Sequence, residues 1–329
     1  MKILLGNQTF DILAGSETWM LTLATELRKL GHEVTAYSPQ LGFIATKLSA
    51  LGVKCVDKLD PAGGKSNKFC PAFNDDDDNF DVVICAHYEI TNYIHQQLPD
   101  VPIIGVCHGI IHKNPETGEI CPEHPITDFK VNYIAVSEEV QGLLKEVYGF
   151  ESVVIRNFYD LERFKKEGKL PKKPRVFLVN SNYWGPQDPI NKIIKEVSTH
   201  YNAEFRGIGA NFAPTYEVEE ILKDVDIVFG MGRSVFEGAC MGKLAVIHGR
   251  WGTGGVLTPQ SYDDLKLTNF SGRAVKGERG FMNADDIIKD IDLHFNQKNV
   301  DAVYDLIKKD HNVKVATKQI LEMANKLIK

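Results

Sequence analysis

Residues 226–248 read DIVFGMGRSVFEGACMGKLAVIH, an apolar run followed by glycines and then by a mixed segment. The apolar residues before Gly230 predict a buried strand, and Ser234 can begin a helix just after the glycines. The first N–H groups of a helix have no partner within it, and the helix dipole adds positive charge there, so such a turn attracts phosphate. Gly230 and Gly232 allow an anion to approach the backbone closely. The segment therefore predicts an anion site.

Arg233 and Glu237 are the charged residues at the start of this predicted helix. Arg233 offers a guanidinium fork beside the anion, and Glu237 lies one turn further on, where it can reach a ribose hydroxyl. A tight strand-to-helix turn with a solvated Glu237 fits the same residues equally well. The glycines do not complete a GxGxxG pattern, so a nicotinamide site is not favoured. A phosphate site and an ordinary turn both remain open.

Short apolar runs and helical segments alternate on both sides of this stretch. Strands are predicted in the first half at residues 2–6, 32–37, 53–56, 81–86, 103–107, 133–136 and 153–155. In the second half they are predicted at residues 175–179, 203–207, 226–230 and 244–249. Such alternation predicts an α/β fold with two Rossmann-like units, each built on a parallel sheet with crossover helices.

The boundary between the units is predicted in the polar, basic stretch 160–174, which ends in Leu-Pro-Lys-Lys-Pro. We therefore expect an N-terminal unit over residues 1–160 and a C-terminal unit over residues 174–312. The last segment, residues 313–329, has an apolar stripe with lysines on its other face, which is typical of an amphipathic helix. We expect this helix to pack back on the N-terminal unit.

The net charge of −6 is distributed unevenly over the 329 residues. Residues 1–157 contain 12 Lys+Arg and 21 Asp+Glu, a net of −9, whereas residues 158–329 contain 26 and 23, a net of +3. A sequence-independent nucleic-acid binder needs a dense basic face, and this balance argues against one. The second half is the better match for an anionic ligand. Six cysteines without a CxxC pair indicate free thiols in a reducing compartment.

These segments resemble family-4 glycosyltransferases, which have the GT-B fold of two facing Rossmann-like domains. Glu237-Gly-Ala-Cys-Met-Gly-Lys-Leu-Ala-Val246 is similar to the second half of the donor motif of that family, E-x7-E. Three further motifs precede it in the chain, in the family's order: residues 14–18 (AGSET) with 27–34 (LRKLGHEV), 135–138 (AVSE) and 154–164 (VIRNFYDLERF). The resemblance covers residues 1 to about 250 and implies the GT-B fold.

The chain departs from the family pattern at several positions. The first Glu of E-x7-E would fall at position 229, where the chain has Phe229. In the family that Glu contacts the transferred sugar, so this departure bears on the sugar and on the retaining chemistry that the resemblance implies. The basic pair that follows the first strand of the family's second domain is replaced by residues 180–184 (NSNYW), and Arg206 or Arg233 is expected to take its role.

The resemblance divides the expected site between the two units. His108, which follows the predicted strand at residues 103–107, is expected near the anomeric centre as the catalytic residue. Glu17 and His87 are expected on the acceptor side, and ordinary loop residues are the alternative for both histidines. The residues expected to bind the donor are Gly15, Ser16, Arg206, Gly232, Arg233, Ser234, Val235 and Glu237.

No metal or cofactor is expected. The run Asp75–Asp78 has the oxygen ligands of a hard cation, but it precedes a strand instead of following one, which favours a solvated acidic loop. Residues 63–66 (GGKS) lack the GxxxxGK spacing of a P-loop. No apolar run reaches the ~18 residues of a membrane span. We expect a cytoplasmic protein without an integral membrane segment, and peripheral membrane contact remains open.

The predicted function is transfer of a sugar from a nucleoside diphosphate sugar to a glycan or small-molecule acceptor, without a metal ion and with retaining chemistry. Two alternatives remain. One is a nucleotide-sugar-binding subunit that has lost turnover, which Phe229 permits. The other is a nucleotide-sugar epimerase with the GT-B fold.

Overall fold

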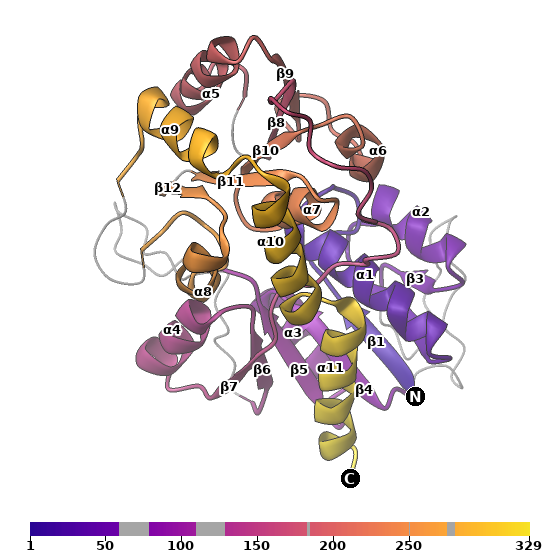
Figure 1. Ribbon diagram of the computed structural model, residues 1–329. Helices are drawn as coiled ribbons and strands as arrows, with labels where there is room; N and C mark the ends of the chain where they lie inside the picture. The colour runs from indigo at the N-terminus through magenta and orange to yellow at the C-terminus, as the bar shows by residue number, and fades with distance from the viewer. Residues whose placement is uncertain (59–78, 110–128, 183–184, 250, 275–279) are drawn as a thin grey trace. The chain divides into compact units, whose positions relative to one another are not determined.

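The computed structural model describes residues 1–58, 79–109, 129–182, 185–249, 251–274 and 280–329 (Figure 1). The chain divides into two compact units, Met1–Arg156 with Val313–Lys329, and Asn157–Asn312. The first unit therefore takes its last helix from the far end of the sequence. Residues 157–174, which contain the expected boundary stretch, belong to the second unit.

The first unit contains a seven-stranded parallel sheet in the order β3-β2-β1-β4-β5-β6-β7. Each strand lies within one residue of its predicted position, because each is a short run of mainly apolar residues; most of them are buried, whereas the edge strand β7 is partly exposed. The strands are β1 (Lys2–Gly6), β2 (Glu33–Tyr37), β3 (Lys54–Val56), β4 (Val82–Ala86), β5 (Ile103–Cys107), β6 (Asn132–Ala135) and β7 (Ser152–Val154).

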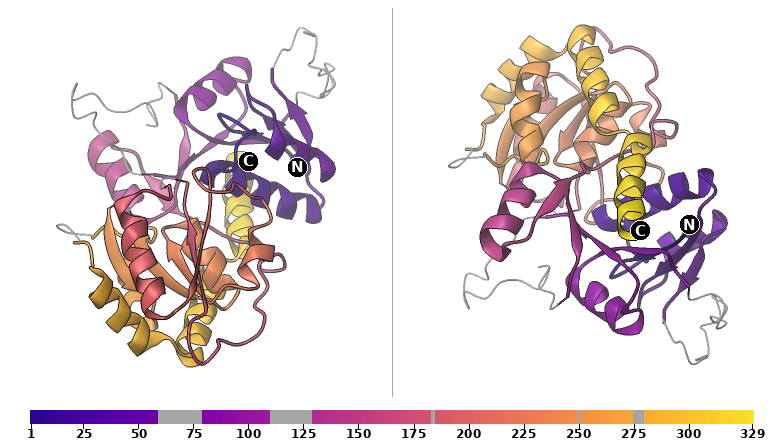
Figure 2. Two further views of the ribbon diagram at one scale, coloured as in Figure 1. Left: turned by 90° about the horizontal axis from the view of Figure 1, so that it is seen from above. Right: turned by 90° about the horizontal axis from the view of Figure 1, so that it is seen from below.

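The helices of the first unit are α1 (Gly15–Lys29), α2 (Phe43–Ala50), α3 (Tyr88–Gln97), α4 (Glu138–Tyr148) and α11 (Val313–Leu327). Helix α1 buries Trp19, Leu23 and Leu27 along one stripe. Ala14 is the N-cap residue of α1, and Ser16 lies inside its first turn. Helix α11 packs beside α1, as the yellow and indigo helices of Figure 2 show.

The second unit contains a five-stranded sheet in the order β12-β11-β10-β8-β9. Its strands are β8 (Val176–Asn180), β9 (Glu204–Ile208), β10 (Ile227–Gly230), β11 (Leu244–Gly249) and β12 (Gly252–Val256). The expectation of a wholly parallel sheet was wrong at one edge, because β12 pairs antiparallel with β11. The sequence predicts no strand there, since three glycines in five residues carry no strand signal.

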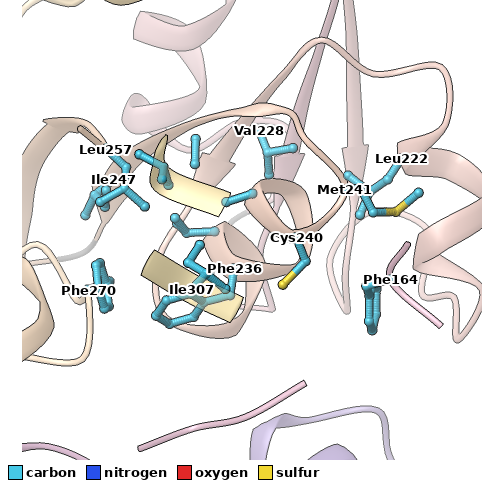
Figure 3. Close-up of a cluster of buried hydrophobic side chains, with 14 of the residues drawn as sticks. Phe164, Leu222, Val228, Phe236, Cys240, Met241, Ile247, Leu257, Phe270 and Ile307 are labelled. Carbon is cyan, nitrogen blue, oxygen red and sulfur yellow. The ribbon is translucent and has the colours of Figure 1, made fainter. Parts of the chain in front are cut away.

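Helices cover both faces of the second sheet: α5 (Pro189–His200), α6 (Val218–Leu222), α7 (Arg233–Cys240), α8 (Pro259–Leu267), α9 (Ala284–His294) and α10 (Gln297–Asp310). Successive side chains of a strand point to opposite faces. Val228 accordingly joins the core beneath α7, α8 and α10, part of which Figure 3 shows. Ile227 and Phe229 join the core on the opposite face, beneath α5 and α9.

None of the helices in the described part of the chain is long and apolar enough to cross a membrane.

Candidate functional site

The second sheet changes direction at β8. The chain continues from β8 to β9 on one side, and later adds β10 on the other side of β8. In open α/β sheets, ligands bind at the carboxyl ends of the strands where the order reverses in this way. Asn180 ends β8 and Gly230 ends β10, so these two residues mark that point.

The turn from β10 into α7 requires its glycines. A Cβ at Gly230 would lie 2.9 Å from the Asn180 carbonyl oxygen and 2.8 Å from the Ser234 Cβ. Gly232 has φ of +55°, a conformation that L side chains rarely adopt, and its N–H donates to the Phe270 carbonyl (3.0 Å). Gly232 is also the N-cap and has no side chain to cap the helix. The first turn of α7 thus presents the backbone N–H groups of Arg233, Ser234 and Val235.

Glu237 is a buried carboxylate one turn into α7, with a neutral and a charged partner. Its Oε2 accepts a hydrogen bond from the Asn180 side-chain amide (3.2 Å), and its Oε1 lies 3.5 Å from a guanidinium nitrogen of Arg233. Burial raises the pKa of the Glu237 carboxyl, and the positive charges of Arg233 and Arg163 act in the opposite direction. A buried carboxylate with adjacent cations fits a site that binds hydroxyl groups and an anion together.

Arg163 is the functional candidate that the sequence analysis missed. Its guanidinium donates two hydrogen bonds to the Glu219 carboxylate (2.8 and 2.7 Å) and one to the Tyr216 carbonyl, and it lies 4.0 Å from the centre of the Tyr216 ring. These contacts fix its charge near Glu237. Arg163 lies within the family motif at residues 154–164, but a resemblance of sequence does not show which residues its side chain contacts.

Arg206 does not join this group. It lies in the middle of β9, where it forms a two-bond pair with Glu204 on the same strand (2.8 and 2.9 Å) and feels the charge of Asp224. Both acidic residues lie toward the amino ends of β9 and β10, away from the turn at Gly230. The structure therefore brings Arg163, instead of Arg206, close to Arg233 and Glu237.

The first sheet reverses between β1 and β4, and its polar residues gather there. Asn7 follows β1, His87 follows β4 and His108 follows β5, and these three strands are neighbours. Glu17, in the first turn of α1, is buried beside them. Its carboxylate accepts hydrogen bonds from the Asn7 amide (3.1 Å) and from the Ser16 hydroxyl (3.0 Å).

Glu17 and His87 form an electrostatic pair at this edge. Burial raises the pKa of the Glu17 carboxyl, while its hydrogen bonds and the nearby His87 lower it. His87 has φ of +69°, which is rare for a residue other than glycine and costs about 1 kcal/mol or more. Its Nε2 is buried and makes no hydrogen bond to the described residues. Backbone strain of this kind is concentrated at functional sites.

His108 lies at the same edge and contacts the core of α1. Its ring meets Trp19 edge-on, with 5.4 Å between ring centres and 79° between the planes. Trp19 is fully buried, so it fixes one side of the imidazole. Gly15, the first residue of α1, is exposed, and a Cβ there would meet nothing within 4 Å.

Comparisons with known proteins find a sequence match in the first unit and similar folds over both units. A family model described as Glycosyltransferase Family 4 matches residues 13–163. A solved glycosyltransferase from Rickettsia africae ESF-5 is 14% identical, with a TM-score of 0.65 over 99% of this chain and 98% of that one. Anabaena Alr3699/HepE, solved with UDP-glucose, is also 14% identical, with a TM-score of 0.61 over 99% of this chain and 100% of that one.

WaaG, a glycosyltransferase involved in lipopolysaccharide biosynthesis, is 8% identical, with a TM-score of 0.61 over 98% of this chain and 99% of that one. The chain has the GT-B fold of these glycosyltransferases, and its residues 13–163 resemble family 4. No curated protein matches its sequence. The family match covers most of the first unit but not its last helix, and the second unit's likeness to the GT-B proteins rests on its fold.

The structure changes the interpretation of Phe229 in this GT-B chain. The motif spacing aligned position 229 with a glutamate that contacts the sugar. Phe229 instead lies inside β10, fully buried, and its ring packs 5.7 Å from that of Phe177. Because only Met231 and Gly232 separate β10 from α7, the chain has no loop at which that glutamate would lie. Phe229 is therefore a core residue and not a replaced site residue.

Within the described ranges of this GT-B chain, no group of three or more His, Cys, Asp or Glu side chains is placed to hold a metal ion. Asp75–Asp78 and the GGKS segment lie outside the described residues. Metal independence therefore stays a prediction.

Proposed function

We propose that the chain transfers a sugar from a nucleoside diphosphate sugar to a hydroxyl-bearing acceptor, with the donor bound by the second unit. One observation carries the proposal: the buried Glu237 carboxylate lies with Arg233 and Asn180 at the switch point of the second sheet, directly behind the N-terminal turn of α7. A nucleotide sugar needs both parts of this arrangement, a carboxylate for its ribose hydroxyls and positive charge for its diphosphate.

The leaving nucleoside diphosphate gains negative charge as the glycosidic bond breaks. Fixed donors that face this charge stabilise the transition state more than the ground state. In the proposal, the N–H groups of Arg233, Ser234 and Val235 and the guanidinium of Arg233 serve this role, without a metal ion. Arg163 contributes its charge, while three of its five N–H groups are bound to Glu219 and to the Tyr216 carbonyl.

The acceptor is assigned to the first unit in this proposal. Glu17, His87 and His108 occupy the carboxyl edge of its sheet, and the partners of Glu17 are mainly neutral donors. Such a group suits a hydroxyl better than a phosphate. HepE was solved with UDP-glucose, and an alpha-glucosyltransferase of similar fold (TM-score 0.50) was solved with UDP and DNA, which makes UDP the first donor nucleotide to test.

Calorimetry with UDP, GDP and ADP, each with and without EDTA, tests the proposal. We expect one of them to bind equally well after chelation and to bind at least tenfold more weakly to Arg233→Ala. Arg175→Ala is the matched control, since Arg175 is largely exposed and pairs with Asp226 at the amino end of β8. Loss of binding on chelation, or equal binding to both variants, would contradict the proposed site.

Turnover of the corresponding nucleotide sugars with an acceptor mixture then tests the reaction. We expect transfer to an acceptor. Nucleotide binding without turnover would favour a binding subunit, and epimer formation without an acceptor would favour an epimerase. Phe229 no longer favours the binding subunit, because it is part of the core.

A further inference from the structure

Arg233 is held from the segment through which the chain enters the second unit. Its guanidinium lies 4.8 Å from the centre of the Tyr159 ring, and one of its Nη groups donates to the Phe158 carbonyl (3.4 Å). Its other Nη group faces Glu237 at 3.5 Å. A guanidinium has five N–H donors, and these contacts occupy two of them among the described residues. Arg233 is thus fixed in place with donors left for an anion.

Both the backbone and the ring of Tyr159 hold the residue beside Arg233. Its N–H donates to the His311 carbonyl (2.9 Å), and His311 in turn donates its Nδ1–H to the Asn157 carbonyl (2.6 Å). The entering segment is therefore bonded to the segment by which the chain leaves the unit. The Tyr159 ring packs 5.2 Å from that of Phe236, in α7 itself.

The hydroxyl of Tyr159, unlike its backbone and its ring, does not hold the residue in place. Tyr159 is fully buried, and its hydroxyl makes no hydrogen bond to any described residue. A buried tyrosine normally finds a partner for its hydroxyl, so what the site requires here is the aromatic ring. The ring face attracts the guanidinium, and this attraction is strongest where both groups are shielded from water.

We infer that Tyr159 is a positioning residue, whose ring holds the Arg233 guanidinium in the geometry that binds the diphosphate. The inference rests on the proposed nucleotide site. Arg163 provides a contrast: it has a similar ring contact with Tyr216, but three of its five donors are bound to Glu219 and to a backbone carbonyl, against two for Arg233. Arg163 is held by Glu219 and Tyr216, whereas Arg233 is the first residue of α7, beside the N–H groups that would face the diphosphate.

A double-mutant cycle separates this role from a general structural one. Tyr159→Leu should weaken binding of the best nucleoside diphosphate by about 5- to 30-fold. Tyr159→Phe, which keeps the ring, should bind within about twofold of the wild type. In the Arg233→Ala background, Tyr159→Leu should have an effect of less than about twofold, because the group that it positions is gone. Thermal unfolding of all four proteins reports the loss of packing separately.

The possible outcomes are distinct. If Arg233→Ala binds nucleotide normally, the proposed site fails. If Arg233→Ala weakens binding but Tyr159→Leu does not, or if Tyr159→Leu has its full effect in both backgrounds, the positioning role is wrong and the site survives. Should Tyr159→Leu not fold, Tyr159→Met fills more of the space with an unbranched side chain and gives the same comparison.

Discussion

Glu17 and Glu237 are buried carboxylates near the switch points of the two sheets. Each lies early in the helix that follows a strand at the switch point of its sheet, and each accepts a hydrogen bond from an asparagine that ends or follows the first strand of its unit, Asn7 or Asn180. Burial raises the pKa of both carboxyl groups. The helices differ in topology, since α1 follows the first strand of its unit and α7 follows the third, but both place a buried carboxylate at a switch point.

The second partner of each carboxylate differs. Glu17 accepts from the neutral hydroxyl of Ser16, whereas Glu237 faces the Arg233 guanidinium and feels the charge of Arg163. Fixed cations suit an anionic ligand, and a carboxylate held by neutral donors suits a hydroxyl. The comparison is the basis for proposing phosphate binding in the second unit and hydroxyl binding in the first.

The largest expected effect is on turnover in the first unit. His108→Ala should lower kcat by about 10²-fold or more, the scale of one positioned acid–base group, with donor affinity within about threefold. In the proposed function the second unit binds the nucleotide, so the loss should concern the transition state. Steady-state kinetics and calorimetry on one preparation measure both quantities. Wild-type turnover would reduce His108 to a structural neighbour of Trp19.

The next largest expected effect is on nucleotide binding, and it distinguishes the Glu237 carboxylate from the Glu17 carboxylate. Glu237→Ala should weaken nucleoside diphosphate binding by about 1.5–3 kcal/mol, the value of a hydrogen bond to a charged group. Glu17→Ala is its matched control and should bind the nucleotide within about twofold of the wild type, because the side-chain hydrogen bonds to its carboxylate from described residues come from the neutral groups of Asn7 and Ser16. Calorimetry on both variants is sufficient. Equal losses would remove the distinction between the units.

The strands could be predicted from the sequence where they are buried, because a buried strand is a short apolar run, as at Ile103–Cys107. The turn at Gly230 could also be predicted, because sterics there leave little choice but glycine. Strand β12 could not, since its glycines show no periodicity. Aligning Phe229 with a site glutamate failed because motif spacing assumes a loop that this chain lacks.

Only one of the two charged neighbours of Glu237 could be predicted from the sequence. Arg233 precedes it by one helical turn, so sequence spacing alone brings the two together. Arg163 comes from the junction segment, and Arg206 lies on a strand of the same sheet, so both depend on the three-dimensional path of the chain. Sequence reasoning identified that the site needs a second cation, but the path of the chain determined which arginine supplies it.

The smallest expected effect is on the pH dependence of stability, and it compares the same two residues. Because burial raises both carboxyl pKa values above 4.5, each group binds its proton more tightly in the folded state. Its contribution to stability is therefore complete at low pH and is lost as the pH rises through the folded pKa. Glutamine does not titrate, so the Tm of Glu17→Gln and of Glu237→Gln should rise relative to wild type between pH 4 and pH 7.

Glu17→Gln should show the larger rise, by no more than about 3 °C. Its amide can donate to the Ser16 hydroxyl while its carbonyl still accepts from Asn7. At Glu237 the amide must face Asn180, whose side chain has to flip, and Arg233 and Arg163 lose the negative charge that offsets their own burial. Thermal unfolding of the three proteins over this pH range measures the difference. A larger rise for Glu237→Gln would mean that the two arginines do not stabilise the carboxylate, and the contrast between the units would then rest on nucleotide binding alone.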